Sequence, residues 1–143
     1  MRTLFKFLLI LFLAASFSPA AYAQKDLYNK LNKKLETLYK NGRTEEAIEV
    51  AKEALQVAEK TFGEKHPYVS VALNNIALLY ISEGKYEKAE KLYERSLKIA
   101  EELLGKDDPK LAGILENMVK CNEKMGKIDK AATLEARLNR IQE

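Results

Sequence analysis

Apolar side chains recur along most of the chain with the period of an α-helix. One stripe has the spacing i, i+3, i+4, i+7 and consists of Leu73, Ile76, Ala77 and Tyr80. That spacing places all four side chains on one face of a helix. The stripe stops at Gly84, and a glycine there can take the left-handed conformation that ends a helix. The pattern therefore predicts an amphipathic helix that ends just before Gly84.

A second stripe with the same period follows this glycine. Its members are Tyr86, Ala89, Leu92, Tyr93, Leu97 and Ala100, and it stops before Gly105. Asp108 and Pro109 come next, which is an N-cap acceptor followed by a proline suited to the first turn of a helix. His66 and Pro67 hold the same place 42 residues earlier. Two amphipathic helices joined by a glycine turn predict a helical hairpin.

The hairpin pattern occurs three times, at an interval of 42 residues. The positions that share this spacing include the turn residues Gly42, Gly84 and Gly126 and the residues five positions later, Ala47, Ala89 and Ala131. A small side chain at the latter positions lets two antiparallel helices approach closely. Three units, at about 27–66, 67–108 and 109–142, account for nearly all of the chain beyond residue 23. One hairpin cannot bury both of its stripes, so the units are expected to stack into an all-α solenoid.

The third unit departs from the pattern at two positions. Asn122 stands where the earlier units have Leu38 and Tyr80, and Glu135 stands where they have an alanine and a tyrosine. Polar residues at these positions predict a terminal unit whose outer surface faces the solvent.

The first 23 residues have the features of a secretory signal. Arg2 precedes an apolar run over residues 4–13, and small residues then lead to Ala21 and Ala23, which fit a signal-peptidase site. The alternative is a membrane anchor, but a membrane span needs about 20 apolar residues and this run is shorter. We expect cleavage after Ala23, a domain of residues 24–143 with no stable membrane insertion, and a periplasmic or secreted location in a bacterium.

Charge and cysteine content narrow the classes of function. Removal of residues 1–23 takes the formal net charge from +3 to +1, because Arg2 and Lys6 are its only charged residues. Lysine and glutamate alternate along the helices without a basic stripe, so nucleic acid is not an expected partner. Cys121 is the single cysteine, which excludes a disulfide within the chain. Stability must then come from packing of the helices.

No group of residues has the pattern of a catalytic or metal site. His66 is the only histidine and lies at a turn, where helix capping explains it better than catalysis or metal binding. Cys121 lies within a predicted helix and is interpreted as a packed thiol, with intermolecular pairing as the alternative. The paired acids do not have the spacing of a calcium loop, and no phosphate-binding or nucleophile motif is present. We expect no enzymatic activity, no cofactor and no bound metal.

The repeat resembles a known family. The residues that carry the resemblance are Leu73, Ile76, Ala77, Tyr80, Gly84, Ala89, Tyr93 and Ser96, and the pattern resembles the tetratricopeptide repeat. The 42-residue period is similar to the longer variant of that repeat found in kinesin light chains. The resemblance covers about residues 27–142. It implies three antiparallel helical hairpins stacked in a short right-handed superhelix, with the first helix of each hairpin on the concave wall.

The resemblance also implies a binding surface. In this family an asparagine of the concave wall contacts the backbone of a bound peptide, and the matching residues are Asn75 and Asn117, with Lys33 in the first unit. The neighbouring inward positions are Asn32, Glu36, Lys40, Asn74, Leu78, Ser82, Glu116, Lys120 and Lys124. The alternative is that these residues are only solvated.

Two functions follow from this pattern. The first is an exported adaptor or scaffold that binds a protein or peptide and catalyses nothing. The second is an assembly component of the cell envelope that acts through self-association or through its convex face. The pattern indicates no particular oligomeric state.

Overall fold

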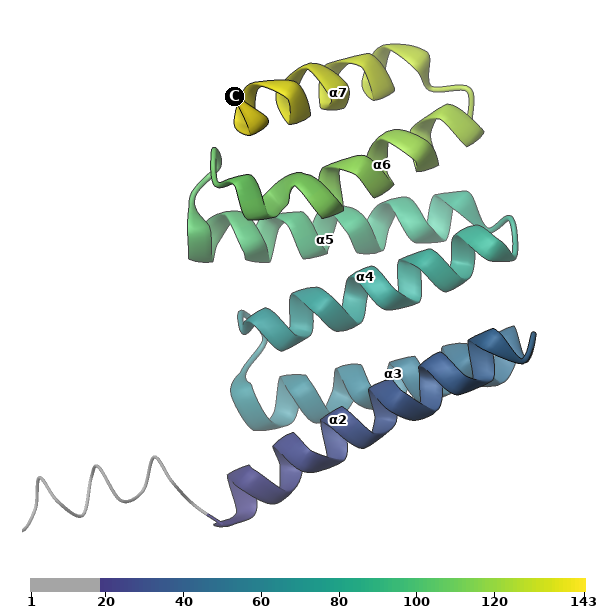
Figure 1. Cartoon of the computed structure of the whole chain (residues 1–143), viewed down its shortest axis with the longest axis vertical. Helices are drawn as coiled ribbons and strands as arrows, with labels where there is room; N and C mark the ends of the chain where they lie inside the picture. Colours follow the sequence, from purple (N-terminus) through teal and green to yellow (C-terminus); the bar gives the residue numbers. More distant parts are fainter. Residues whose placement is uncertain (1–18) are drawn as a thin grey trace, which may run out of the picture.

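The computed structural model describes residues 19–143, and all regular structure in this range is helical. The elements are α2 (Pro19–Lys40), α3 (Thr44–Phe62), α4 (Pro67–Ser82), α5 (Tyr86–Leu104), the short 3-10 helix η1 (Pro109–Leu111), α6 (Ala112–Lys124) and α7 (Ile128–Gln142). Consecutive helices form the antiparallel hairpins α2–α3, α4–α5 and α6–α7, which stack one on another (Figure 1). The predicted all-α solenoid is confirmed.

Each hairpin turn has the same hydrogen bonds. At the first turn the N–H of Arg43 donates to the Leu38 carbonyl at 2.9 Å, and the N–H of Gly42 donates to the Tyr39 carbonyl at 3.0 Å. This pair of bonds is the Schellman motif, which needs a left-handed residue after the helix. Gly42, Gly84 and Gly126 have φ values of 74°, 71° and 72°. The turn is therefore repeated in all three units.

Replacement of Gly84 by valine is expected to lower the free energy of unfolding by about 1 to 2 kcal/mol, because a side chain is disfavoured in left-handed backbone. Open space surrounds the position of an added Cβ, so the loss comes from the backbone and not from a clash. Urea unfolding measures the change. Gly113→Ala is the control for the gain of a side chain at a glycine, because Gly113 lies inside α6, where an added methyl group favours the helix.

The starts of the second and third units are capped by side chains. Nδ1 of His66 accepts a hydrogen bond from the Tyr68 N–H at 3.2 Å, so the capping role predicted for His66 is confirmed. Oδ1 of Asp108 accepts from the Lys110 N–H at 2.8 Å. In the third unit this cap begins the 3-10 turn η1, and the α-helix starts only at Ala112.

The core runs through all three hairpins. Ala47, Ala89 and Ala131 are buried where the two helices of each hairpin meet. At the crossing of α4 and α5, Ser70 and Ser96 each donate from Oγ to the other's carbonyl, at 3.0 and 2.8 Å. Two hydrophobic clusters fill the space between the helices, and Tyr80 and Leu92 pack against both. The stack therefore has a continuous interior.

The structure corrects one expectation for the third unit. Asn122 was expected to face the solvent, but its side chain is fully buried, whereas Glu135 is exposed. The expectation for Asn122 is wrong because α6 packs against α5 on one side and is covered by α7 on the other. Only α7 is terminal, so the outer surface of the last unit begins with that helix and not with α6.

The predicted secretory signal falls mostly on residues 1–18, which lie outside the described residues. Ala21, Tyr22 and Ala23 are in the first turns of α2, and every residue from Pro19 to Leu27 is exposed. Tyr28 is the first buried residue of that helix, where its OH donates to the Tyr68 carbonyl at 3.0 Å. Between residues 19 and 143, no helix is long and apolar enough to cross a membrane.

Candidate functional site

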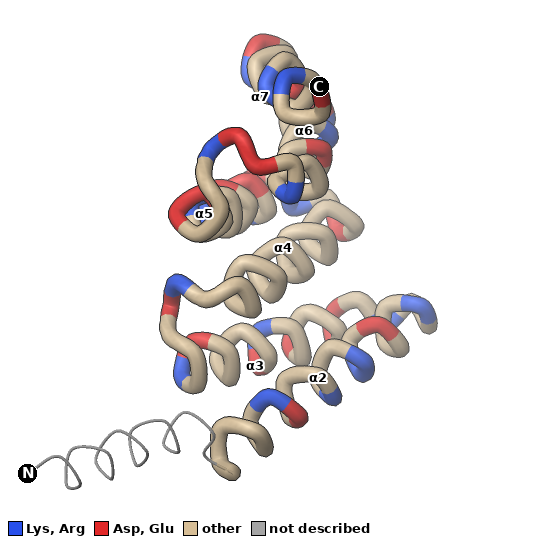
Figure 2. The backbone as a smooth tube through the Cα atoms, turned by 60° about the vertical axis from the view of Figure 1, so that its left-hand side comes forward, with Lys and Arg blue, Asp and Glu red and all other residues tan. Residues whose placement is uncertain are grey.

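The central helix α4 differs from its neighbours in charge. The sequence from Pro67 to Ser82 contains no charged residue, and α4 is uncoloured along its length in Figure 2, where charged residues mark the other helices. Val71 and Leu78 on this helix are about half exposed. Two hollows lie on either side of α4, and these define the candidate site.

The first hollow lies between α4 and α6 and has a volume of about 340 Å³. Its lining consists of Pro67, Ser70, Val71, Asn74, Ala100, Leu103, Leu104, Lys110, Gly113, Ile114 and Asn117. The C-terminal end of α5 closes it, with Leu103 and Leu104 exposed toward solvent. Lys110 is the only ionisable residue in the lining. The surface therefore suits an apolar group.

The second hollow lies between α2 and α4 and has a volume of about 500 Å³. Its lining consists of Leu35, Tyr39, Asn75, Leu78, Leu79, Ile81 and Ser82. Apart from the Tyr39 phenol it contains no ionisable group. The two hollows therefore have the same character, and each is formed where the first helices of successive units face each other.

A pair of asparagine amides from successive units lies beside each hollow. Nδ2 of Asn75 lies 3.3 Å from Oδ1 of Asn32 across the first two units, and Nδ2 of Asn117 lies 3.3 Å from Oδ1 of Asn74 across the next two. An asparagine amide has two donor hydrogens and two acceptor lone pairs. Asn75 and Asn117 therefore keep one N–H and the Oδ1 oxygen for a further partner. A peptide unit can use both.

The other predicted residues do not all join this site. Ser82 lines the second hollow, where its Oγ donates to the Leu79 carbonyl at 2.7 Å. Lys33 lies instead in a separate shallow depression on α2, beside Lys34 and Thr37. Lys40 forms an ion pair with Glu36 on its own helix. Lys40 lines neither hollow.

The lysines of α6 lie outside the two hollows. Lys120 and Lys124 are exposed and form no ion pair within residues 19–143. Neither residue contributes to the lining of either hollow. The structure therefore brings together the asparagines and Ser82, and it leaves the predicted lysines apart from them.

Sequence reasoning missed most of the apolar walls. These residues are Leu35, Tyr39, Val71, Leu103, Leu104 and Ile114. The sequence could have predicted Val71, because it is an apolar residue outside the buried stripe of a helix that has no charge. The sequence could not have predicted Leu103 and Leu104, since their exposure depends on how the end of α5 meets α6.

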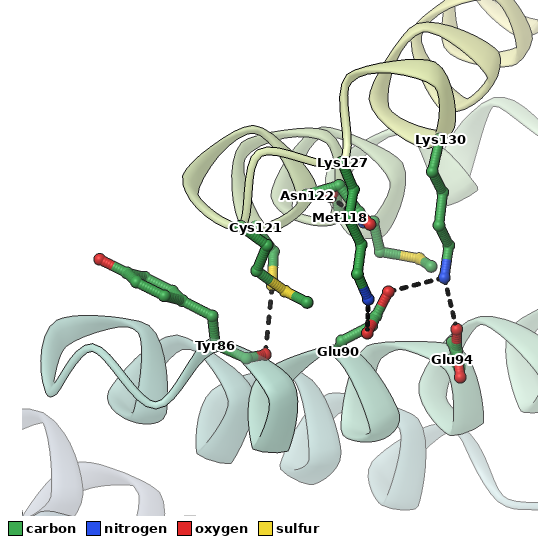
Figure 3. Close-up of polar contacts among 9 residues, drawn as sticks. Tyr86, Glu90, Glu94, Met118, Cys121, Asn122, Lys127 and Lys130 are labelled. Atoms are coloured by element: carbon green, nitrogen blue, oxygen red, sulfur yellow. Dashed lines mark hydrogen bonds and ion pairs between the residues drawn. The ribbon is translucent and has the colours of Figure 1, made fainter.

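A second polar cluster joins α5 to the last hairpin (Figure 3). The carboxylate of Glu90 is nearly buried and lies 2.7 Å from both the Lys127 and the Lys130 ammonium groups. Lys130 also pairs with Glu94 at 2.7 Å. Burial by itself would raise the pKa of Glu90, but the two ammonium groups outweigh it and hold the pKa below its ordinary value. This cluster stabilises the junction between the second and third units.

Cys121 lies beside this cluster and is fully buried. Its Sγ lies 3.5 Å from the Tyr86 carbonyl and 3.9 Å from the Met125 sulfur. Burial raises the pKa of the thiol, and the nearby Glu90 charge raises it further. A buried thiol with a raised pKa is a poor nucleophile. Among residues 19–143, no group of histidines, cysteines and acids could hold a metal ion.

Acid is expected to weaken the Glu90 junction. Because the folded pKa of Glu90 is lowered, its contribution to stability is present above the ordinary value of 4.5 and is lost as pH falls through the folded pKa. At pH 7, Glu90→Gln should destabilise the fold by about 1 kcal/mol, and this difference should shrink toward pH 3. Urea unfolding at the two pH values measures it. Glu64→Gln, on an exposed residue, should show neither effect, and a pH-independent loss for Glu90→Gln would contradict the assignment.

Stacked helical hairpins with a row of inter-unit hollows define the chain as an α-solenoid repeat protein. The family model of the tetratricopeptide repeat matches residues 27–102 and 68–142. The chain belongs to the tetratricopeptide repeat family, whose members are generally adaptors that bind other proteins. A comparison with curated proteins finds no match.

Solved structures share this fold. BtubC (BKLC) from P. vanneervenii has 26% sequence identity and a TM-score of 0.75, over 80% of this chain and 46% of that chain. The TPR domain of Arabidopsis FLU has 21% identity and a TM-score of 0.71, over 83% and 98%. A putative kinesin light chain from Podosopora anserina has 18% identity and a TM-score of 0.70, over 87% and 57%. The chain thus spans about half the length of BtubC.

Proposed function

We propose that this chain is a non-enzymatic adaptor or scaffold that is exported from a bacterial cell and binds a protein or peptide along the wall formed by α2, α4 and α6. The observation that carries the proposal is the pairing of each apolar hollow with an inter-unit asparagine pair. The hollows supply apolar contact area, and the amides supply a donor and an acceptor for a ligand backbone. No cofactor is needed for such binding.

Export is part of the proposal and rests on the sequence of residues 1–23. Cleavage after Ala23 would remove only exposed residues of α2 and would leave the buried Tyr28 in place. We expect the protein recovered from its native host to begin at Gln24. Mass analysis of the N-terminus decides this, and retention of residues 1–23 in a membrane fraction would contradict it.

Binding through the groove is tested by Asn75→Ala combined with Asn117→Ala. Each change removes one side-chain hydrogen bond to the partner, which is worth about 0.5 to 1.5 kcal/mol. Together they should weaken binding roughly 5-fold to 150-fold. The partner is first recovered by pull-down and its affinity then measured by calorimetry, with circular dichroism to verify helix content.

The control variant for the groove is Lys91→Glu combined with Lys98→Glu, on the second helix of the middle hairpin. Both lysines are exposed on α5 and lie outside the two hollows. Binding that survives the asparagine changes and is lost with the lysine changes would favour the alternative, in which the convex face carries an assembly role.

A further inference from the structure

Exposed apolar side chains gather at the two hollows. Within residues 19–143, eight large hydrophobic residues are exposed. Five of them line a hollow, namely Tyr39, Val71, Leu78, Leu103 and Leu104. Exposed apolar groups that are scattered singly need no explanation, but groups that gather in concave surfaces indicate binding. A partner bound in the hollows would therefore cover most of the exposed apolar side chains.

The spacing of the hollows is set by α4. Val71 lines the first hollow and Leu78 lines the second, and both are on this helix. Seven helical residues rise about 10.5 Å. The hollows lie on opposite sides of α4, so a sideways step of about one helix diameter, roughly 10 Å, adds to this axial distance. A strand-like peptide rises about 3.3 Å per residue and its side chains alternate between two faces, so two anchors on one face that span both hollows lie four residues apart. One extended segment can thus reach both hollows.

The charge of the site limits what can occupy it. The helix between the hollows has no charged residue, and Lys110 is the only ionisable group at the first hollow. A charged side chain placed over α4 would lose hydration and would find no opposite charge on that helix. A cation at the first hollow would also meet Lys110. The surface is therefore complementary to an uncharged segment with apolar anchors.

We propose that the partner presents one extended, uncharged segment with two apolar side chains four residues apart, one seated in each hollow. This inference rests on the proposed groove function and makes it specific. Asn117 and Asn75 lie in the linings of the first and second hollow respectively. They hold the backbone beside each anchor, so the spacing of the two anchors determines which segments bind.

The experiment uses a phage-displayed library of random twelve-residue peptides, selected on the protein purified from cells that express the full chain. Selected peptides are synthesised, and fluorescence anisotropy measures their affinity. We expect two apolar positions four residues apart, with few charged residues between them. Alanine at either position should weaken binding roughly 10-fold to 100-fold, because a buried aliphatic side chain contributes that much.

Two protein variants test which hollow binds each apolar anchor of the peptide. Val71→Ser and Leu78→Ser each remove one wall and leave the core intact, since both residues are about half exposed. Each variant should weaken binding to a similar extent. When the peptide already has alanine at the anchor that contacts the changed residue, the protein variant should cause no further loss of affinity. Such non-additivity is the signature of direct contact.

Other outcomes separate this inference from the proposed function. Peptides whose binding depends on Asn75 and Asn117 but not on Val71, Leu78 or anchor spacing would overturn the two-anchor inference and leave groove binding intact. Peptides whose affinity is unchanged by every groove variant but is lost with Lys91→Glu and Lys98→Glu would overturn both the two-anchor inference and groove binding. A library that yields no groove-dependent binder also overturns the two-anchor inference.

Discussion

Leu73→Ala is expected to lower the free energy of unfolding by about 2 to 5 kcal/mol. Leu73 is fully buried at the centre of α4 and belongs to the hydrophobic cluster that joins the first hairpin to the second. The change removes apolar area and leaves a cavity that helices held from both sides cannot close. Domains of this size are stable by about 5 to 15 kcal/mol, so the loss is a large share of the total.

Urea unfolding followed by circular dichroism measures this loss. Leu27→Ala is the matched control, because it makes the same change on the partly exposed first turns of α2. That control should shift the free energy of unfolding by under about 0.5 kcal/mol. Equal effects for the two variants would mean that the first and second hairpins are not packed through Leu73.

Asn122→Leu is expected to stabilise the protein by about 1 to 2 kcal/mol, because the cost of its buried, unpaired Oδ1, about 1 to 3 kcal/mol, exceeds the contribution of the hydrogen bond that is lost, about 0.5 to 1.5 kcal/mol. Asn122 is fully buried, and its Nδ2 donates to the Met118 carbonyl at 2.8 Å. Its Oδ1 has no donor among the described residues. Leucine has a similar volume and stands at the matching position of the first unit, as Leu38.

The measurement is again the urea midpoint, with an unchanged slope to show that the same surface is exposed on unfolding. Asn139→Leu is the matched control on an exposed position of α7, where little change is expected. A destabilised Asn122→Leu would show that the buried oxygen is hydrogen-bonded in solution.

The junction between the second and third units also has a polar residue at a buried position where the junction between the first and second units has an apolar one. Ile48 is buried where the next unit has Glu90. The carboxylate is held by Lys127 and Lys130, so ion pairs stand at a position where the first junction has an apolar side chain. A buried ion pair often contributes less than an apolar pair of the same volume.

The sequence alone determined the helices, their turns and the repeat. These features depend on local chemistry, in which apolar spacing selects the helix face, glycine permits the left-handed turn at Gly84, and His66 caps the helix that follows it. Stacking followed as well, because a single hairpin leaves a stripe uncovered. The recurrence of Asn75 and Asn117 also located two of the residues beside the hollows.

Only the tertiary structure decided how the units meet. The amide pairs join residues 43 positions apart, and the first hollow takes its walls from α4, α5 and α6 together. Periodicity places a residue on a face of its own helix, but which neighbour covers that face depends on helix crossings. Asn122 became buried and Leu103 stayed exposed for this reason, since packing between helices, and not the polarity of one residue, determines what solvent reaches.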